Sequence, residues 1–119
     1  MENPIQTALA EDGGVVVTLL GEIDFTNADE VAQAIRDAVT EWSPPILRID
    51  LENATFIDST GLGALIEGYR AAAERSSRFM VINPTDGFCR VLSVTGLCEL
   101  FGMDAEAGAT REPSSDLAI

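Results

Sequence analysis

Two residue types that dominate active-site chemistry are missing from this 119-residue chain: it has no histidine, and all seven of its basic residues are arginine. Histidine is the usual general base at neutral pH and a common metal ligand, and lysine is the alternative base for a serine nucleophile. The two cysteines, Cys89 and Cys98, lack the spacing of a metal site and are expected to be small buried residues. These absences argue against an enzyme, and we expect no catalytic residue, no metal and no cofactor.

Long apolar runs and positive charge are also scarce. Runs such as Val15–Leu20 are too short to span a bilayer, and the first residues lack the basic and apolar segments of a signal peptide. Twenty acidic residues face seven basic ones, for a net charge of -13. Such a surface repels nucleic acids and anionic membranes and steers a basic protein partner, although acidity also serves solubility alone. We therefore expect a soluble cytoplasmic protein with no direct nucleic-acid or membrane partner.

The length and the hydrophobic content of 46% fit one domain over residues 1–119. Its core is expected over about 5–103. From 104 to 119 the apolar pattern fades into small and polar residues, which predicts a weakly ordered tail.

Runs rich in β-branched and apolar residues predict the strands, and the turn Glu11–Gly14 predicts an antiparallel hairpin between the first two. The predicted strands are Thr7–Ala10, Val15–Ile23, Ile46–Leu51, Arg78–Asn83 and Leu97–Phe101. The segment Glu52–Asp58 is expected to be a loop.

Apolar residues at steps of three and four predict three helices. The first ends near Trp42 and has Thr26 as its expected N-cap; the second begins near Ser59; the third covers Asp86–Gly96, with Gly96 as C-cap. Strands that alternate with helices indicate an α/β domain with a mixed, mostly parallel sheet of about four to five strands.

The segment Phe56–Leu65, FIDSTGLGAL, places Ser59 at the start of the second helix, which leaves several interpretations. Ser59 can be part of a helix cap. A catalytic serine is disfavoured, because neither histidine nor lysine is present to activate it. A phosphate loop is disfavoured because the P-loop lysine is missing and Ile66 stands where the dinucleotide pattern needs a third glycine, although weak nucleotide binding stays open. Finally, a helix N-terminus tolerates an added phosphate, so Ser59 can be a modification switch.

Three segments, Gly21–Val31 (GEIDFTNADEV), Phe56–Leu65 and Val91–Leu97 (VLSVTGL), occur in an order and at intervals that resemble the STAS-domain anti-sigma-factor antagonists of bacteria. The resemblance covers roughly Ile5–Met103 and implies a mixed sheet with helices packed on one side. It also implies that the unphosphorylated protein binds an anti-sigma factor with serine kinase activity, which releases a sigma factor. Phosphorylation would abolish this binding, and a PP2C-type phosphatase would restore it.

By position in the motif, the resemblance implies that Ser59, and not Thr60, is phosphorylated. It implies a partner-binding surface of Asp24, Asp58, Ser59, Thr60, Gly61, Leu62 and Gly63. The alternative for each aspartate is a helix cap, or for Asp24 a solubilising acid, and the alternative for Gly61 and Gly63 is tight packing. One departure from the family is the tail, where Pro113 and the lack of an apolar face disfavour a closing helix.

Two functions follow from the resemblance. The first is an anti-sigma-factor antagonist switched at Ser59. The second is a non-switching STAS scaffold or accessory subunit of a signalling or transport complex, in which Ser59 only caps its helix.

Overall fold

The structure, a computed structural model, describes residues 5–98 and residue 101. The strands are β1 (Ile5–Leu9), β2 (Val15–Leu19), β3 (Gly21–Ile23), β4 (Ile46–Asp50), β5 (Ala54–Ile57) and β6 (Arg78–Ile82). The helices are α1 (Ala28–Trp42), α2 (Ser59–Glu74) and α3 (Asp86–Thr95).

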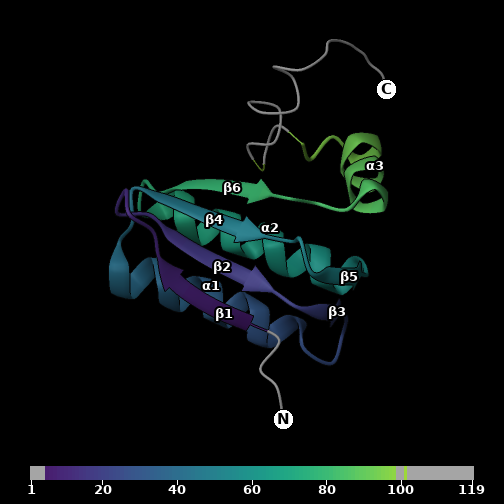
Figure 1. The fold of residues 1–119 in the computed structure, drawn as a ribbon, viewed down its shortest axis with the longest axis horizontal. Coiled ribbons are helices and arrows are strands. Elements are labelled where there is room, and N and C mark those ends of the chain that lie inside the picture. Colours follow the sequence, from purple (N-terminus) through teal and green to yellow (C-terminus); the bar gives the residue numbers. More distant parts are fainter. Residues whose placement is uncertain (1–4, 99–100, 102–119) are drawn as a thin grey trace.

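The main sheet has the strand order β1-β2-β4-β6. The strands β2, β4 and β6 are parallel, and β1 pairs antiparallel with β2 through the predicted hairpin, with Ile5 opposite Leu19. Helices α1 and α2 cover one face of this sheet (Figure 1). The α/β class, the mixed sheet and the antiparallel edge are therefore confirmed.

The core lies between that face and the two helices. Alternate residues of the central strands point into it, and in β2 these are Val15, Val17 and Leu19. The helices approach each other closely at Gly68, where an added Cβ would lie 2.7 Å from Cγ2 of Ile35. This close contact lies in the middle of both helices and sets how near α1 and α2 pack to each other.

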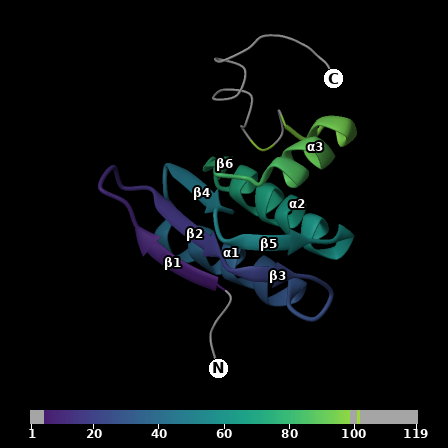
Figure 2. The same ribbon diagram turned by 45° about the vertical axis from the view of Figure 1, so that its right-hand side comes forward.

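The prediction of one strand over Val15–Ile23 is wrong, because the chain leaves the main sheet after Leu19. Gly21 adopts a φ of +73°, which a glycine reaches without strain, and its N–H donates to the carbonyl of Asn53. The redirected segment β3 pairs in parallel with β5, so the predicted loop over Glu52–Asp58 contains a strand instead. Figure 2 shows β3 and β5 side by side, next to the main sheet. A strand this short has too few residues to show an alternating pattern, so sequence reasoning missed it.

Other boundaries also differ from the predictions. The first strand begins at Ile5, and α1 begins at Ala28 after Asn27, so Thr26 is not its N-cap. The predicted strand over Leu97–Phe101 is absent at its described residues, where the Phe101 N–H bonds the Leu97 carbonyl as in a helical turn. Cys89 and Cys98 are half-buried rather than buried, and both thiols are free.

The predicted end of α3 is confirmed. Gly96 has a φ of +77°, and its N–H bonds the carbonyls at the end of the helix. The tail over 104–119 lies outside the described residues.

Candidate functional site

The small β3–β5 sheet brings the two most informative sequence motifs together. Ile23 and Ile57 are register partners, and the N–H of Asp58 donates to the carbonyl of Ile23 at 3.1 Å. Asp24 therefore follows β3 directly, and Ser59 follows the neighbouring strand β5 after one residue, at the same edge of the sheet. This edge is where loops after parallel strands commonly carry function.

Asp58 is the N-cap of α2. Its backbone is extended, and its Oδ1 accepts the Gly61 N–H at 2.9 Å and the Thr60 hydroxyl at 2.6 Å. These two bonds orient the first turn of the helix and hold the Thr60 hydroxyl inward to the cap. Asp58 therefore has the helix-cap role that the sequence offered as its alternative to partner binding.

Ser59 is the first helical residue and not the cap. It is exposed, and among the described residues no hydrogen bond engages its hydroxyl. The interpretation of Ser59 as a structural cap is thus wrong, because the Asp58 carboxylate caps the helix. The hydroxyl is open to another molecule.

The cap makes stability depend on pH. The hydrogen bonds from Thr60 and then from the Gly61 N–H lower the pKa of the Asp58 carboxyl below its ordinary value. A carboxyl whose folded-state pKa is depressed stabilises the fold above its unfolded pKa of about 4 and loses that contribution as the pH falls through the folded value. We expect Asp58→Ala to lower the melting temperature at neutral pH, and this deficit to shrink in acid.

Thermal unfolding of the wild type and the variant, measured across this pH range, tests the expectation. Asp58→Asn is the control, because its side-chain oxygen still accepts the cap bonds without titrating. A deficit for Asp58→Ala that stays constant with pH would contradict a role for the ionised carboxylate.

Asp24 organises the loop between β3 and α1. Its Oδ1 accepts both the N–H and the hydroxyl of Thr26, and its own N–H donates to the side chain of Asn27. These bonds fold the loop so that Phe25 projects outward with 78% of its surface exposed. Phe25 was not among the predicted site residues, and the available signal was an aromatic residue between polar residues in a loop.

The glycines of the motif have different surroundings. A Cβ added to Gly61 would lie 2.9 Å from Cγ2 of Ile57 and 3.0 Å from the carbonyl oxygen of Ile23. A Cβ added to Gly63 would meet no atom within 4 Å. Gly61 therefore lets α2 approach the small sheet, and half-buried Leu62 packs on the core, whereas Gly63 faces open space.

Two grooves flank the start of α2. One, of about 220 Å³, lies between β5 and α3 and includes exposed Phe56 and Val91 in its lining. The other, of about 260 Å³, lies between α1 and α2 and is lined by Phe25, Ala28, Asp29, Ala32, Thr60, Gly63, Ala64 and Glu67. The chain passes from the first groove at Ile57 to the second at Thr60, with Ser59 between them. Exposed aromatic residues around a free hydroxyl are typical of a protein-binding surface.

The described part of the chain shows no group of three or more cysteine, aspartate and glutamate residues placed to hold a metal ion. None of its helices has both the length and the apolar character needed to cross a membrane.

The family model of the STAS domain matches residues 6–110. The anti-sigma-B factor antagonist of Listeria monocytogenes is 30% identical over 84 residues, which are 71% of this chain and 73% of the relative. A crystal structure of an anti-sigma factor antagonist from Mycobacterium paratuberculosis is 34% identical, covers 91% of this chain and 95% of that one, and has a TM-score of 0.70. The Bacillus protein SpoIIAA in its phosphorylated form shares the fold at 23% identity, over 81% and 86% of the chains, with a TM-score of 0.66. The chain therefore belongs to the STAS-domain family, and these relatives are anti-sigma-factor antagonists.

Proposed function

We propose that this protein is an anti-sigma-factor antagonist whose binding is switched at Ser59. The unphosphorylated form binds an anti-sigma factor with serine kinase activity and so releases a sigma factor. Phosphorylation of Ser59 abolishes the complex, and a PP2C-type phosphatase restores it. The names of the relatives support the role, and the exposed, unengaged Ser59 hydroxyl supports the switch.

The geometry suits a modification that leaves the fold intact. A phosphate adds about -1.5 to -2 charges, and at the first turn of α2 it meets the positive end of the helix dipole. Asp58 keeps the cap, so the phosphate displaces no bond of the helix terminus. Phosphorylation therefore changes only the outer surface. A partner whose binding surface accommodates a neutral hydroxyl would have to desolvate a dianion there.

The serine is proposed as a substrate of its partner and not as a catalyst. A serine hydroxyl needs an adjacent base to act as a nucleophile, and the chain has neither histidine nor lysine to supply one. The hydroxyl lies beside an aspartate that is already engaged by Thr60 and Gly61. A kinase that brings its own base and nucleotide needs only access to the hydroxyl.

Intact mass and site mapping test the switch. The protein is purified from its native host, both growing and stressed, and we expect one phosphate on Ser59 whose occupancy differs between the two conditions. Ser59→Ala should lose this phosphate, and Thr60→Ala, as the control for the neighbouring hydroxyl, should keep it. If no phosphate occurs in any condition and Ser59→Ala behaves as the wild type in the host, the non-switching scaffold becomes the better interpretation.

A further inference from the structure

The groove between α1 and α2, called here the α1–α2 groove, has an unusual construction for a helix–helix junction. Half of its lining residues are small, namely Ala28, Ala32, Gly63 and Ala64, and its volume is about 260 Å³. Large side chains normally fill the space between packed helices. The Phe25 ring, 78% exposed, contributes to its wall without closing it. The groove is thus open and mostly apolar, and its volume has room for a side chain from outside.

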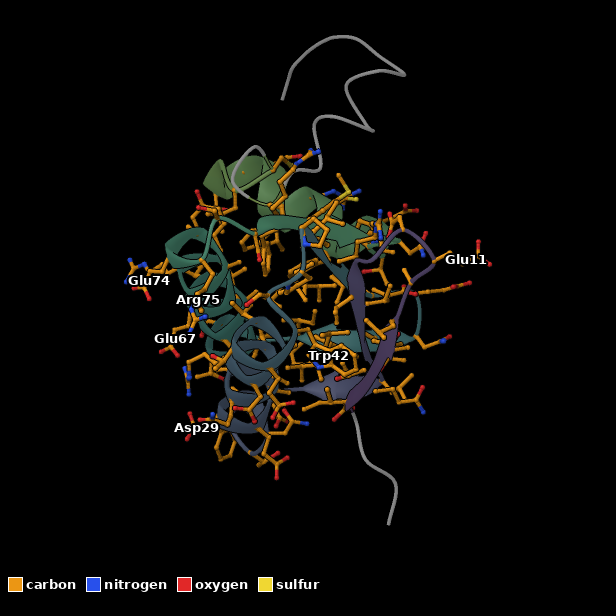
Figure 3. The ribbon with its side chains drawn as sticks, turned by 90° about the vertical axis from the view of Figure 1, so that its left-hand side faces the viewer. Glu11, Asp29, Trp42, Glu67, Glu74 and Arg75 are labelled. Atoms are coloured by element: carbon orange, nitrogen blue, oxygen red, sulfur yellow. The ribbon has the colours of Figure 1, made fainter. Side chains whose placement is uncertain are left out.

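The charged residues that line this groove are both acidic. Asp29 comes from the first turn of α1 and Glu67 from α2, and Figure 3 shows both pointing outward on the same side of the molecule. Arg36 Nη1 already pairs with Glu67 Oε1 at 2.8 Å, whereas no hydrogen bond or ion pair among the described residues engages the Asp29 carboxylate. An occupant with an apolar stem and a positive end complements this lining, and the net charge of -13 favours its approach.

We propose that the α1–α2 groove binds an arginine side chain of the protein partner. The aliphatic stem lies over the alanines and Gly63, and the guanidinium reaches the Asp29 carboxylate and the face of Phe25. Arginine suits the site better than lysine, because a planar guanidinium stacks on an aromatic ring and binds a carboxylate with two parallel bonds. The Arg36–Glu67 pair shows that a guanidinium already bridges the same two helices. The proposal rests on the proposed function, in which the adjoining Ser59 surface binds the anti-sigma factor.

The first test uses the isolated, unphosphorylated protein and a small probe, N-acetyl-arginine amide. We expect NMR shift changes at millimolar probe that concentrate on Phe25, Asp29 and Gly63. The uncharged isostere N-acetyl-citrulline amide should leave these signals unchanged. In Gly63→Leu, whose new side chain fills the groove, the arginine probe should leave the signals of Phe25 and Asp29 unchanged. Shifts spread evenly over the acidic surface, equal shifts with citrulline or with N-acetyl-lysine amide, or an unchanged response of Gly63→Leu would overturn the proposal.

The second test measures affinity for the anti-sigma factor that co-purifies with the protein from its host. Phe25→Ala and Asp29→Asn should each weaken binding about tenfold, the latter with a smaller dependence on salt. The matched controls are Val94→Ala, an equally exposed apolar residue on α3, and Glu30→Gln, the neighbouring acid of α1, and both should bind as the wild type. Equal losses of affinity in the variants and in their controls would overturn the proposal that the groove binds arginine, and would leave the proposed switch at Ser59 unaffected. A failed Ser59 switch would likewise leave the result with the arginine probe unaffected.

Discussion

Ser59→Asp should fold as the wild type does and lose the anti-sigma factor, whereas Ser59→Ala should bind it whatever the activity of the kinase. The substituted residue is the first of α2, where an acid is compatible with the helix dipole, so the melting temperature should stay nearly unchanged. A desolvated carboxylate without a partner in an interface costs about 3 kcal/mol or more, which corresponds to at least a hundredfold loss of affinity. Calorimetric titration of the anti-sigma factor with each variant measures the effect.

Thr40→Asp is the matched charge control, because Thr40 is exposed on α1 in the last turns, far from the start of α2. It adds the same charge and should retain wild-type affinity to within about twofold, since distant surface charges are screened by salt. Full binding by Ser59→Asp, with Ser59→Ala also unchanged, would show that the position does not face the partner. The switch would then be wrong even though the family assignment stands.

Gly61→Ala and Gly63→Ala should change stability in opposite directions, although the two glycines are two residues apart in the same helix. The methyl group at Gly61 collides with a branched side chain of β5 and with the Ile23 carbonyl, so we expect a loss of about 1 to 3 kcal/mol. The methyl group at Gly63 meets open space, and alanine is the better helix former, so a gain of up to about 1 kcal/mol is expected. Urea unfolding of both variants gives these free energies.

The two substitutions control for each other. Both gain the higher helix propensity of alanine, and only Gly61→Ala introduces a steric collision. A Gly61→Ala protein as stable as Gly63→Ala would contradict the close approach of α2 to the β3–β5 sheet. That approach places Ser59 beside the Asp24 loop, so such a result would also weaken the proposed binding surface.

Local patterns in the sequence were enough to predict the α/β class, the opening hairpin, the C-cap at Gly96 and the start of α2 near Ser59. Each depends on residues close in the chain, such as the β-branched residues Val15, Val16 and Val17 of the second strand or the glycine that ends α3. The resemblance carried by three segments led to the STAS family, and the family model over residues 6–110 agrees with it.

Pairings between distant segments were decided only in the tertiary structure. The turn at Gly21 sends β3 to β5, and neither strand is long enough to show its pairing in the sequence. The identity of the helix cap was also decided only by the folded chain. Either Asp58 or Ser59 can cap a helix by its chemistry. In the structure the Asp58 N–H bonds the Ile23 carbonyl of β3, and the Asp58 carboxylate caps α2. Gly61 and Gly63 are alike in sequence and differ only in what packs against them. The α1–α2 groove likewise arises from helix packing, because its lining comes from residues up to 42 positions apart (Phe25 to Glu67) that meet only in the folded chain.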